Sequence, residues 1–307
     1  MTSTIEALQN LYVAKGGTLS DVADLVTIPD MLTALANLQP SPVTRKALIT
    51  IIDDDGTNRT DDDHTGIRSF LHNKNIPMAF AVPSEVPGNG GAYTIGQLTQ
   101  MVSEGDEVVM HGVNVNDDSS VSLSEFKTMV DSSVEWANTN DFSSDVFVYP
   151  RGLQPTDTNF NEKIEYLSSK GIKAAYSINC PVESSETENY EEWYSYENGY
   201  TCHGTTNAIP FATMPNGYSK KLFFNRMELR RATLTAGEWW NNIIVEAIEN
   251  KNYITFLLHS FSSEWSTEGT DGKTTTQLFE EFITNLVENY GDQIEFVTPT
   301  EALAYIK

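Results

Sequence analysis

Short apolar runs alternate with helix-like segments along most of the chain. The apolar, β-like runs cover residues 47–52, 77–82, 107–110, 146–149, 174–178, 253–258 and 294–297. Segments with the apolar spacing of helices lie at residues 65–74, 95–103, 122–138, 161–170 and 276–290. Repeated strand–helix units predict an α/β fold with a mostly parallel sheet, and this many units predict a distorted (β/α) barrel.

The first 39 residues follow a different pattern, which predicts a small helical module. Ile5, Leu8 and Leu11 share one face of a short helix, and a second apolar helix face follows near residue 32. Helices this short cannot bury an apolar face alone, so the module either caps the barrel or joins copies of the chain. Pro40 and Pro42 predict a stiff linker over residues 40–46. The barrel is therefore expected over residues 47–307.

The net charge of the chain limits the classes of partner that it can be expected to bind. Asp and Glu number 43 against 19 Lys and Arg, which leaves a formal net charge of −24. Such a surface repels phosphate backbones and anionic lipid headgroups, so neither nucleic acid nor a membrane is an expected partner. No run approaches the roughly 18 apolar residues that a membrane-spanning helix needs. A neutral, amino-sugar or cationic ligand fits this charge better.

Polar residues follow four of the predicted strands. The sequences at these strand ends are Asp53-Asp54-Asp55-Gly56, His111-Gly112, Pro150-Arg151-Gly152 and His259-Ser260. Catalytic groups of parallel βα folds collect at the carboxyl ends of the strands. Carboxylates and histidines that meet at one barrel mouth can supply metal ligands and an acid–base pair.

These strand ends resemble, in order, the motifs of the NodB-homology polysaccharide deacetylases of carbohydrate esterase family 4. Asp54-Asp55-Gly56 resembles the end of the Thr-Phe-Asp-Asp-Gly motif, and the segment from Gly105 to His111 resembles the second motif. Tyr149-Pro150-Arg151-Gly152 resembles the Pro-Tyr-Gly motif, and Leu257-Leu258-His259 the closing Leu-x-His motif. The resemblance covers residues 47–307 and implies a metal-dependent N-deacetylase of polysaccharides.

The resemblance also implies a role for each matching residue. Asp54 is then the general base that activates water, and His259 the general acid that protonates the departing amine. Asp55 and His111 are then ligands of a divalent metal, zinc, cobalt or nickel, and the backbone N–H of Arg151 stabilises the oxyanion. The candidates for contact with the N-acetylated cell-wall polysaccharide are Tyr149, Pro150, Trp193 and Trp265.

Two positions depart from the family pattern. Val115 stands where the family has its second metal-binding histidine, and valine cannot bind a metal. A third ligand could come from His64 or from the loop after His111, where the candidates are Asn114, Asn116 and Asp117. Neutral amide oxygens bind transition metals poorly, so a lower metal affinity is expected.

Val148 replaces the arginine that usually pairs with the catalytic aspartate. Arg151, Arg226 or Arg230 could take over that pairing from elsewhere in the barrel.

An insertion over residues 181–220 interrupts the alternation of strands and helices. It is rich in aromatic residues, which could stack on sugar rings or pack the loop onto the barrel. Cys180 and Cys202 flank part of it and could form a disulfide or stay as free thiols.

The N-terminal module resembles the short segment that begins many tail, baseplate and head-fibre proteins of bacteriophages that infect Gram-positive hosts. The resemblance implies attachment to other virion proteins through residues 1–39, as a homotrimer. The first ten residues lack the basic and apolar regions of a signal peptide. The expected location is therefore the virion, or the cytoplasm if the phage resemblance is misleading.

Three hypotheses remain from the sequence. The first is a virion-attached deacetylase, the second a catalytically disabled barrel that binds glycan as an adhesin, and the third a structural fibre component. Val115 and Val148 are the residues that keep the second hypothesis open.

Overall fold

The computed structural model describes the barrel and divides the chain into two compact units, residues 1–45 and 46–307. The described residues are 46–56, 66–153, 157–178, 222, 224–235, 244–245, 247–249 and 253–305. The predicted module over residues 1–39 lies outside them, as do nearly all of the linker, the insertion over 181–220, both cysteines, His64 and Trp193. No helix in the described part of the chain is both long and apolar enough to cross a membrane.

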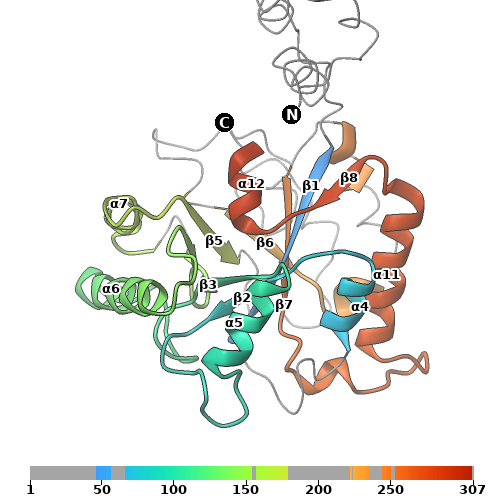
Figure 1. Ribbon diagram of the computed structural model, residues 1–307, viewed down its shortest axis with the longest axis horizontal. Coiled ribbons are helices and arrows are strands. Elements are labelled where there is room, and N and C mark those ends of the chain that lie inside the picture. Colours follow the sequence, from blue (N-terminus) through green and yellow to red (C-terminus); the bar gives the residue numbers. More distant parts are fainter. Residues whose placement is uncertain are drawn as a thin grey trace, which may run out of the picture. The chain divides into compact units, whose positions relative to one another are not determined.

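Eight strands form one sheet, in which all the described pairings are parallel (Figure 1). They are β1 (Ala47–Asp54), β2 (Ala79–Val82), β3 (Glu107–Met110), β4 (Val146–Val148), β5 (Ala174–Ile178), β6 (Phe224–Glu228), β7 (Tyr253–Leu258) and β8 (Ile294–Phe296). Strands β2 to β7 pair in sequence order, and β1 pairs with both β7 and β2. Seven strands thus close a ring, which confirms the predicted barrel.

Strand β1 is shared between the ring and the eighth strand. Its carboxyl end pairs with β2, with Ile52 opposite Ala79, while its amino end pairs with β8, with Ala47 opposite Ile294. The early part of β1 thus has β8 as its neighbour where β2 has not yet begun. Strand β1 therefore changes its neighbour on this side from β8 to β2 along its length.

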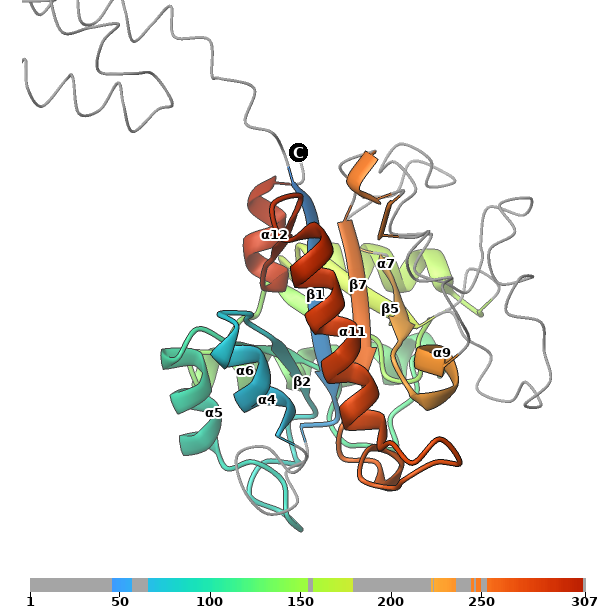
Figure 2. The same ribbon diagram turned by 90° about the vertical axis from the view of Figure 1, so that its right-hand side faces the viewer.

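The helices lie around the outside of the strands (Figures 1 and 2). They are α4 (Ile67–Asn73), α5 (Ile95–Ser103), α6 (Leu123–Thr139), α7 (Phe160–Ser169), α9 (Arg231–Thr235), α11 (Thr275–Tyr290) and α12 (Pro299–Tyr305), with a 3₁₀ turn, η5, at Ser263–Trp265. Side-chain and backbone hydrogen bonds fix where α5, α6 and α11 begin, because each starts with a Thr or Ser capping box.

The buried side chains form two layers, one on each side of the strands. Ile49 and Ile51 belong to a cluster shared with the surrounding helices, whereas Leu48 and Ile52 belong to a second, smaller cluster made almost wholly of strand residues. Successive strand side chains point to opposite faces, so this smaller cluster fills the barrel interior. Asp54, two residues beyond Ile52, therefore points into the barrel at its carboxyl end.

Helix α12 closes the opposite end of the barrel. Ala302 packs into the interior cluster, and the backbone N–H of Thr300 donates to the Glu107 carboxylate at 2.9 Å. Glu107 is buried at the start of β3, and burial raises the pKa of its carboxyl group. Helix α12 thus covers the barrel interior at the amino ends of the strands. The candidate catalytic residues lie at the carboxyl ends.

Candidate active site

Strand β1 ends in a turn that presents consecutive carboxylates. Asp54 is the last residue of the strand, and Asp55 follows in the left-handed region with a φ of 73°. Gly56 continues the turn with a φ of 56°, and a Cβ at this position would lie 2.8 Å from a Val82 side-chain carbon. A glycine is needed there for both its conformation and its size.

Arg226 holds the Asp54 carboxylate from across the barrel interior. Its two terminal nitrogens donate to the two carboxylate oxygens at 2.5 and 2.8 Å, and the Arg226 side chain is fully buried. Burial alone would raise the pKa of Asp54, but Arg226 and then His111 hold that pKa below its ordinary value. Asp54 is therefore an oriented carboxylate at neutral pH.

His111 follows β3 and faces both carboxylates. Its Nδ1 lies 3.1 Å from the Val148 carbonyl oxygen, which can only accept, so the Nδ1–H donates there. Its Nε2 lies 3.5 Å from Asp55 Oδ1 and 3.7 Å from Asp54 Oδ2. The structure thus brings together three of the residues predicted from the strand ends.

His259 follows β7 and is held by a glutamate that the sequence analysis did not identify. Its Nδ1 lies 2.9 Å from Glu228 Oε1, and Arg230 Nε lies 4.0 Å from the other oxygen of Glu228. Burial would lower the pKa of His259, but Glu228 and then Asp54 raise it to about 9. Glu228 keeps a pKa below its ordinary value because His259 outweighs the effect of burial. The imidazole is therefore protonated at neutral pH.

Asp53 fixes the turn that follows His259. Its carboxylate accepts from the backbone N–H of Ser260 at 2.9 Å and from the Ser260 hydroxyl at 2.5 Å. Burial raises the pKa of Asp53 to about 6. These bonds tie β1 to the loop after β7.

The loop after β3 uses its own polar side chains to hold its shape. Asp117 Oδ2 accepts from the backbone N–H groups of Val113 and Asn114, at 2.5 and 3.2 Å. Asn114 Oδ1 accepts from the backbone N–H of Asn116 at 2.9 Å. Of the loop residues expected to supply a third metal ligand, Asn114 and Asp117 are thus engaged within the loop. Val115 is 47% exposed.

Asp55 and His111 fit two neighbouring positions around a zinc ion. Ligand bonds of about 2.0–2.1 Å at tetrahedral angles separate two ligand atoms by about 3.3–3.4 Å, close to the 3.5 Å seen between Asp55 Oδ1 and His111 Nε2. The Val148 carbonyl orients the imidazole as outer partners of metal-binding histidines do. The described residues contain no group of three or more His, Cys, Asp or Glu placed to hold a metal. Asp55 and His111 therefore supply two of the four ligands of a tetrahedral metal site.

Three of the residues predicted to contact the sugar, Tyr149, Pro150 and Trp265, are buried. Tyr149 is fully buried, and its hydroxyl donates to the Leu222 carbonyl at 2.7 Å. Trp265 is 1% exposed and packs edge-on against Phe279. A position at a strand end or in a loop is therefore not enough to expose an aromatic ring.

Pro150 and Arg151 form the turn that follows β4. Pro150 is buried beside Gly112, and its carbonyl accepts from the Ser119 N–H at 3.0 Å. Arg151 is exposed, with a left-handed φ of 55°. Within the described residues its backbone N–H donates to no backbone carbonyl.

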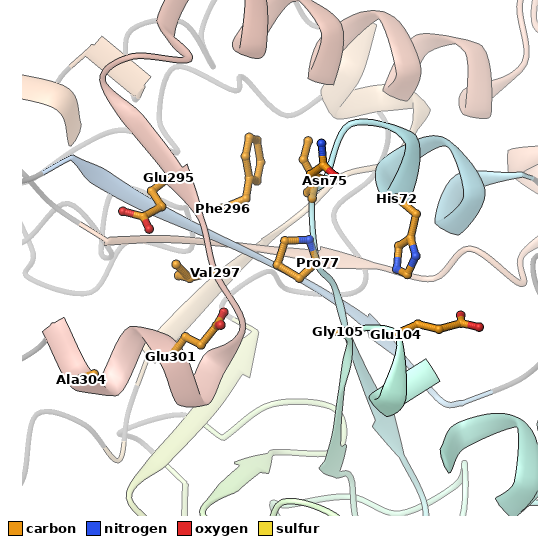
Figure 3. Close-up of a pocket in the computed structure, with 11 residues that line it drawn as sticks. His72, Asn75, Pro77, Glu104, Gly105, Glu295, Phe296, Val297, Glu301 and Ala304 are labelled. Carbon is orange, nitrogen blue, oxygen red and sulfur yellow. The ribbon is translucent and has the colours of Figure 1, made fainter. Parts of the chain in front are cut away.

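A pocket of about 610 Å³ lies away from these residues, at the amino ends of the strands (Figure 3). Its walls include His72 from α4, Pro77 before β2, and Phe296 and Glu301 from β8 and α12. None of the residues that meet at the carboxyl ends lines it. The convergence of Asp54, His111 and His259, rather than the size of a cavity, identifies the candidate active site.

Comparison with known proteins defines the fold. No family model and no curated protein matches the chain. A putative polysaccharide deacetylase from Mycobacterium smegmatis superposes with a TM-score of 0.53 at 11% identity, over 86% of this chain and 91% of that one. The fold is that of the polysaccharide-deacetylase barrel.

Two further solved structures match over most of this chain. A 4-alpha-glucanotransferase from Thermococcus litoralis matches with a TM-score of 0.51 at 13% identity, over 84% of this chain and 38% of that one. A family 4 acetyl xylan esterase from Clostridium thermocellum, in complex with a cobalt ion, matches with a TM-score of 0.41 at 14% identity, over 84% and 91% of the two chains. Because a deacetylase and a glucanotransferase both have this barrel, the function has to be argued from the side chains.

Sequence reasoning missed Glu228 and left the partner of Asp54 open among three arginines. Both Glu228 and Arg226 lie on β6, a strand that the apolar pattern does not indicate. Their two-residue spacing between Phe224 and Leu229 is the sequence signal that both point into the barrel.

Proposed function

We propose that the barrel hydrolyses N-acetyl groups on a polysaccharide, with Asp54 as general base and His259 as general acid. One arrangement supports this most strongly, namely that Asp54 is paired with the buried Arg226 whereas His259 is held by Glu228, so the two groups favour opposite charges. Asp54 has a lowered pKa and is ionised, whereas His259 has a pKa of about 9 and is protonated. A base that is ready to accept a proton and an acid that is ready to donate one are what amide hydrolysis needs.

In this proposal each proton has a defined route. Asp54 takes a proton from water as the water oxygen bonds to the acetyl carbon, and Arg226 keeps the carboxylate oriented through both of its oxygens. The Arg151 N–H stabilises the charge that develops on the acetyl oxygen. His259 then protonates the amine nitrogen as the C–N bond breaks, which gives acetate and a free amino sugar.

Glu228 is a positioning residue for the acid. Its contact with Nδ1 turns Nε2 of His259 towards the substrate and stabilises the imidazolium before the proton is given away.

Asp55 and His111 are the residues that would hold a divalent metal, of which zinc, cobalt and nickel are the candidates. Such an ion would polarise the acetyl carbonyl and make the attacking water more acidic. The 3.5 Å separation of Asp55 Oδ1 and His111 Nε2 supports this pairing. With Val115 in place of a third ligand, the metal is expected to bind weakly and to exchange readily.

The test of this proposal is acetate release from N-acetylglucosamine oligomers in the presence of Zn²⁺, Co²⁺ or Ni²⁺. Wild-type protein should release acetate, and Asp54→Asn and His259→Asn should each reduce the rate by at least about 100-fold. Glu295→Gln, at the other end of the barrel, is the matched control and should keep the wild-type rate. Absence of acetate with all three metals would reject the enzymatic proposal.

The incomplete metal site favours a second candidate function, a glycan-binding barrel without turnover. Under this alternative, Asp54→Asn would leave the affinity for the oligomer unchanged, and the wild-type protein would release no acetate. An enzyme would instead lose turnover and keep much of its binding. Binding and turnover measured on the same two proteins separate the alternatives.

We further propose that residues 1–39 attach the chain to other virion proteins of a bacteriophage, as a homotrimer, and present the barrel to the cell-wall polysaccharide. The resemblance of this segment to phage attachment modules supports the proposal, and the net charge of −24 disfavours nucleic acid and membrane partners. Sedimentation of the full chain should give three times the monomer mass of 34.2 kDa, and a variant without residues 1–39 should be monomeric. A full chain that stays monomeric at all concentrations would contradict the trimer.

A further inference from the structure

Phe261 differs from the other aromatic side chains of the described chain. Every other Phe, Tyr or Trp side chain that the structure describes belongs to one of the two hydrophobic clusters or packs against one. Phe261 does neither, and it is partly exposed. A large apolar ring that does not contribute to the core needs another explanation.

The position of this ring is fixed by the turn that follows β7. The Ser262 N–H donates to the His259 carbonyl at 3.0 Å and closes the turn. Ser260 is anchored through its backbone and its hydroxyl to the buried Asp53 carboxylate. Phe261 lies between these two anchored residues, so the backbone presents its ring in a defined place.

That place is beside the candidate general acid. The ring centroids of Phe261 and His259 are 5.7 Å apart, and the ring planes are perpendicular. Glu228 occupies the Nδ1 edge of the imidazole. The phenyl ring is thus a partly exposed apolar surface next to the imidazole that would protonate the leaving amine.

We infer that Phe261 is the platform on which the N-acetylated sugar packs, and this inference rests on the proposed function. The carbon-bound hydrogens of a pyranose ring form apolar faces, and burying such a face against an aromatic ring removes apolar area of both from water. A sugar placed on Phe261 has its amide nitrogen close to His259. The buried Tyr149 and Trp265 cannot provide this surface.

The inference is tested by the kinetics of acetate release with three variants at this position. Phe261→Ala should raise KM for N-acetylglucosamine tetramer about five- to tenfold, with kcat within about twofold of wild type. Phe261→Trp should restore KM to within about twofold of wild type, whereas Phe261→Leu should not, because it keeps apolar volume without a flat face. Phe296→Leu, in the pocket at the opposite end of the barrel, is the matched control and should leave KM unchanged.

A pH profile separates a platform from a residue that only tunes the acid. If Phe261 contacts the sugar, the alkaline limb of kcat/KM stays where it is in wild type for Phe261→Ala. If kcat falls at constant KM, or the alkaline limb moves, Phe261 acts through His259 and the platform is rejected.

The affinity for the same tetramer, measured by calorimetry, tests the platform separately from the enzymatic proposal. The two proteins compared are Asp54→Asn and the double variant Asp54→Asn with Phe261→Ala. Weaker binding by the double variant, without acetate release from wild type, would support the platform and reject the enzyme. Acetate release by wild type, with equal binding by the two proteins and a KM that Phe261→Ala leaves unchanged, would reject the platform alone. Absence of both binding and turnover would reject both.

Discussion

The contact between Glu228 and His259 predicts how the activity depends on pH. Glu228→Gln removes the negative charge but keeps an oxygen that can accept from Nδ1–H of His259, so the geometry should survive. What the variant loses is the stabilisation of the imidazolium. The pKa of His259 should then fall from about 9 towards its ordinary value of 6.5, because burial continues to oppose the charge.

The size of the effect follows from these two pKa values. At pH 8, about nine-tenths of His259 is protonated if its pKa is about 9, but only about 3% if its pKa is 6.5. The rate at pH 8 should therefore fall about 30-fold in Glu228→Gln. At pH 6 His259 is mostly protonated in both proteins, so their rates should agree within about twofold.

The assay is kcat/KM for acetate release between pH 5.5 and pH 10, because this ratio reports the free enzyme's acid and base. The alkaline limb should lie near pH 9 in wild type and about two and a half units lower in the variant. Glu295→Gln, far from the candidate active site, should leave the limb unchanged. An alkaline limb that stays near pH 9 in Glu228→Gln would refute the assignment of His259 as the acid held by Glu228.

Two other predictions address the ion pair and the metal. Arg226→Met should reduce the free energy of unfolding by about 3–5 kcal/mol in urea titrations, because it leaves the buried Asp54 carboxylate without its partner. Asp54→Asn combined with Arg226→Met should recover part of that loss, and a single variant as stable as wild type would contradict the pairing. Val115→His should tighten zinc binding at least about tenfold in competition with a chelating dye, since it restores the missing ligand type. Equal affinities would mean that another residue already completes the metal site.

Most of the barrel can be predicted from the sequence because its strands are buried on both faces. Such strands form continuous apolar runs, and the runs predict seven of the eight strands within two or three residues. The predicted polar strand ends also lie at the carboxyl ends of the observed strands β1, β3, β4 and β7. Barrel closure brings these ends to one edge, which is why the sequence can indicate the candidate active site.

Strand β6 is not predicted from the sequence because it carries the charged partners of Asp54 and His259. Arg226 and Glu228 occupy inward positions that an apolar residue would fill in an ordinary strand, and this breaks the pattern. Their charges are compensated by Asp54 and His259, which lie 172 and 31 residues away along the chain. Partnerships over such separations leave no local signal. The short helices α9 and α12 escape prediction as well, since five to seven residues give little periodicity.

The aromatic residues show the same limit. The sequence predicts Tyr149 and Trp265 at the sugar site, yet both are buried, while Phe261 is partly exposed beside His259. Whether an aromatic ring packs inward or outward at a strand end depends on the turn that follows it. Here the bond between Asp53 and Ser260 decides the course of that turn, and it joins residues 207 positions apart.

The most direct test of the account is the product balance of a single reaction in ¹⁸O-labelled water. N-acetylglucosamine tetramer is incubated with the full chain and Zn²⁺, Co²⁺ or Ni²⁺, and acetate and free amine are counted by mass spectrometry. Hydrolysis by Asp54 and His259 predicts equal amounts of both products, one ¹⁸O atom in each acetate, and neither product above background with Asp54→Asn. Tetramer that binds to the wild-type protein and is recovered fully acetylated would contradict the enzymatic account and establish a glycan-binding barrel in its place.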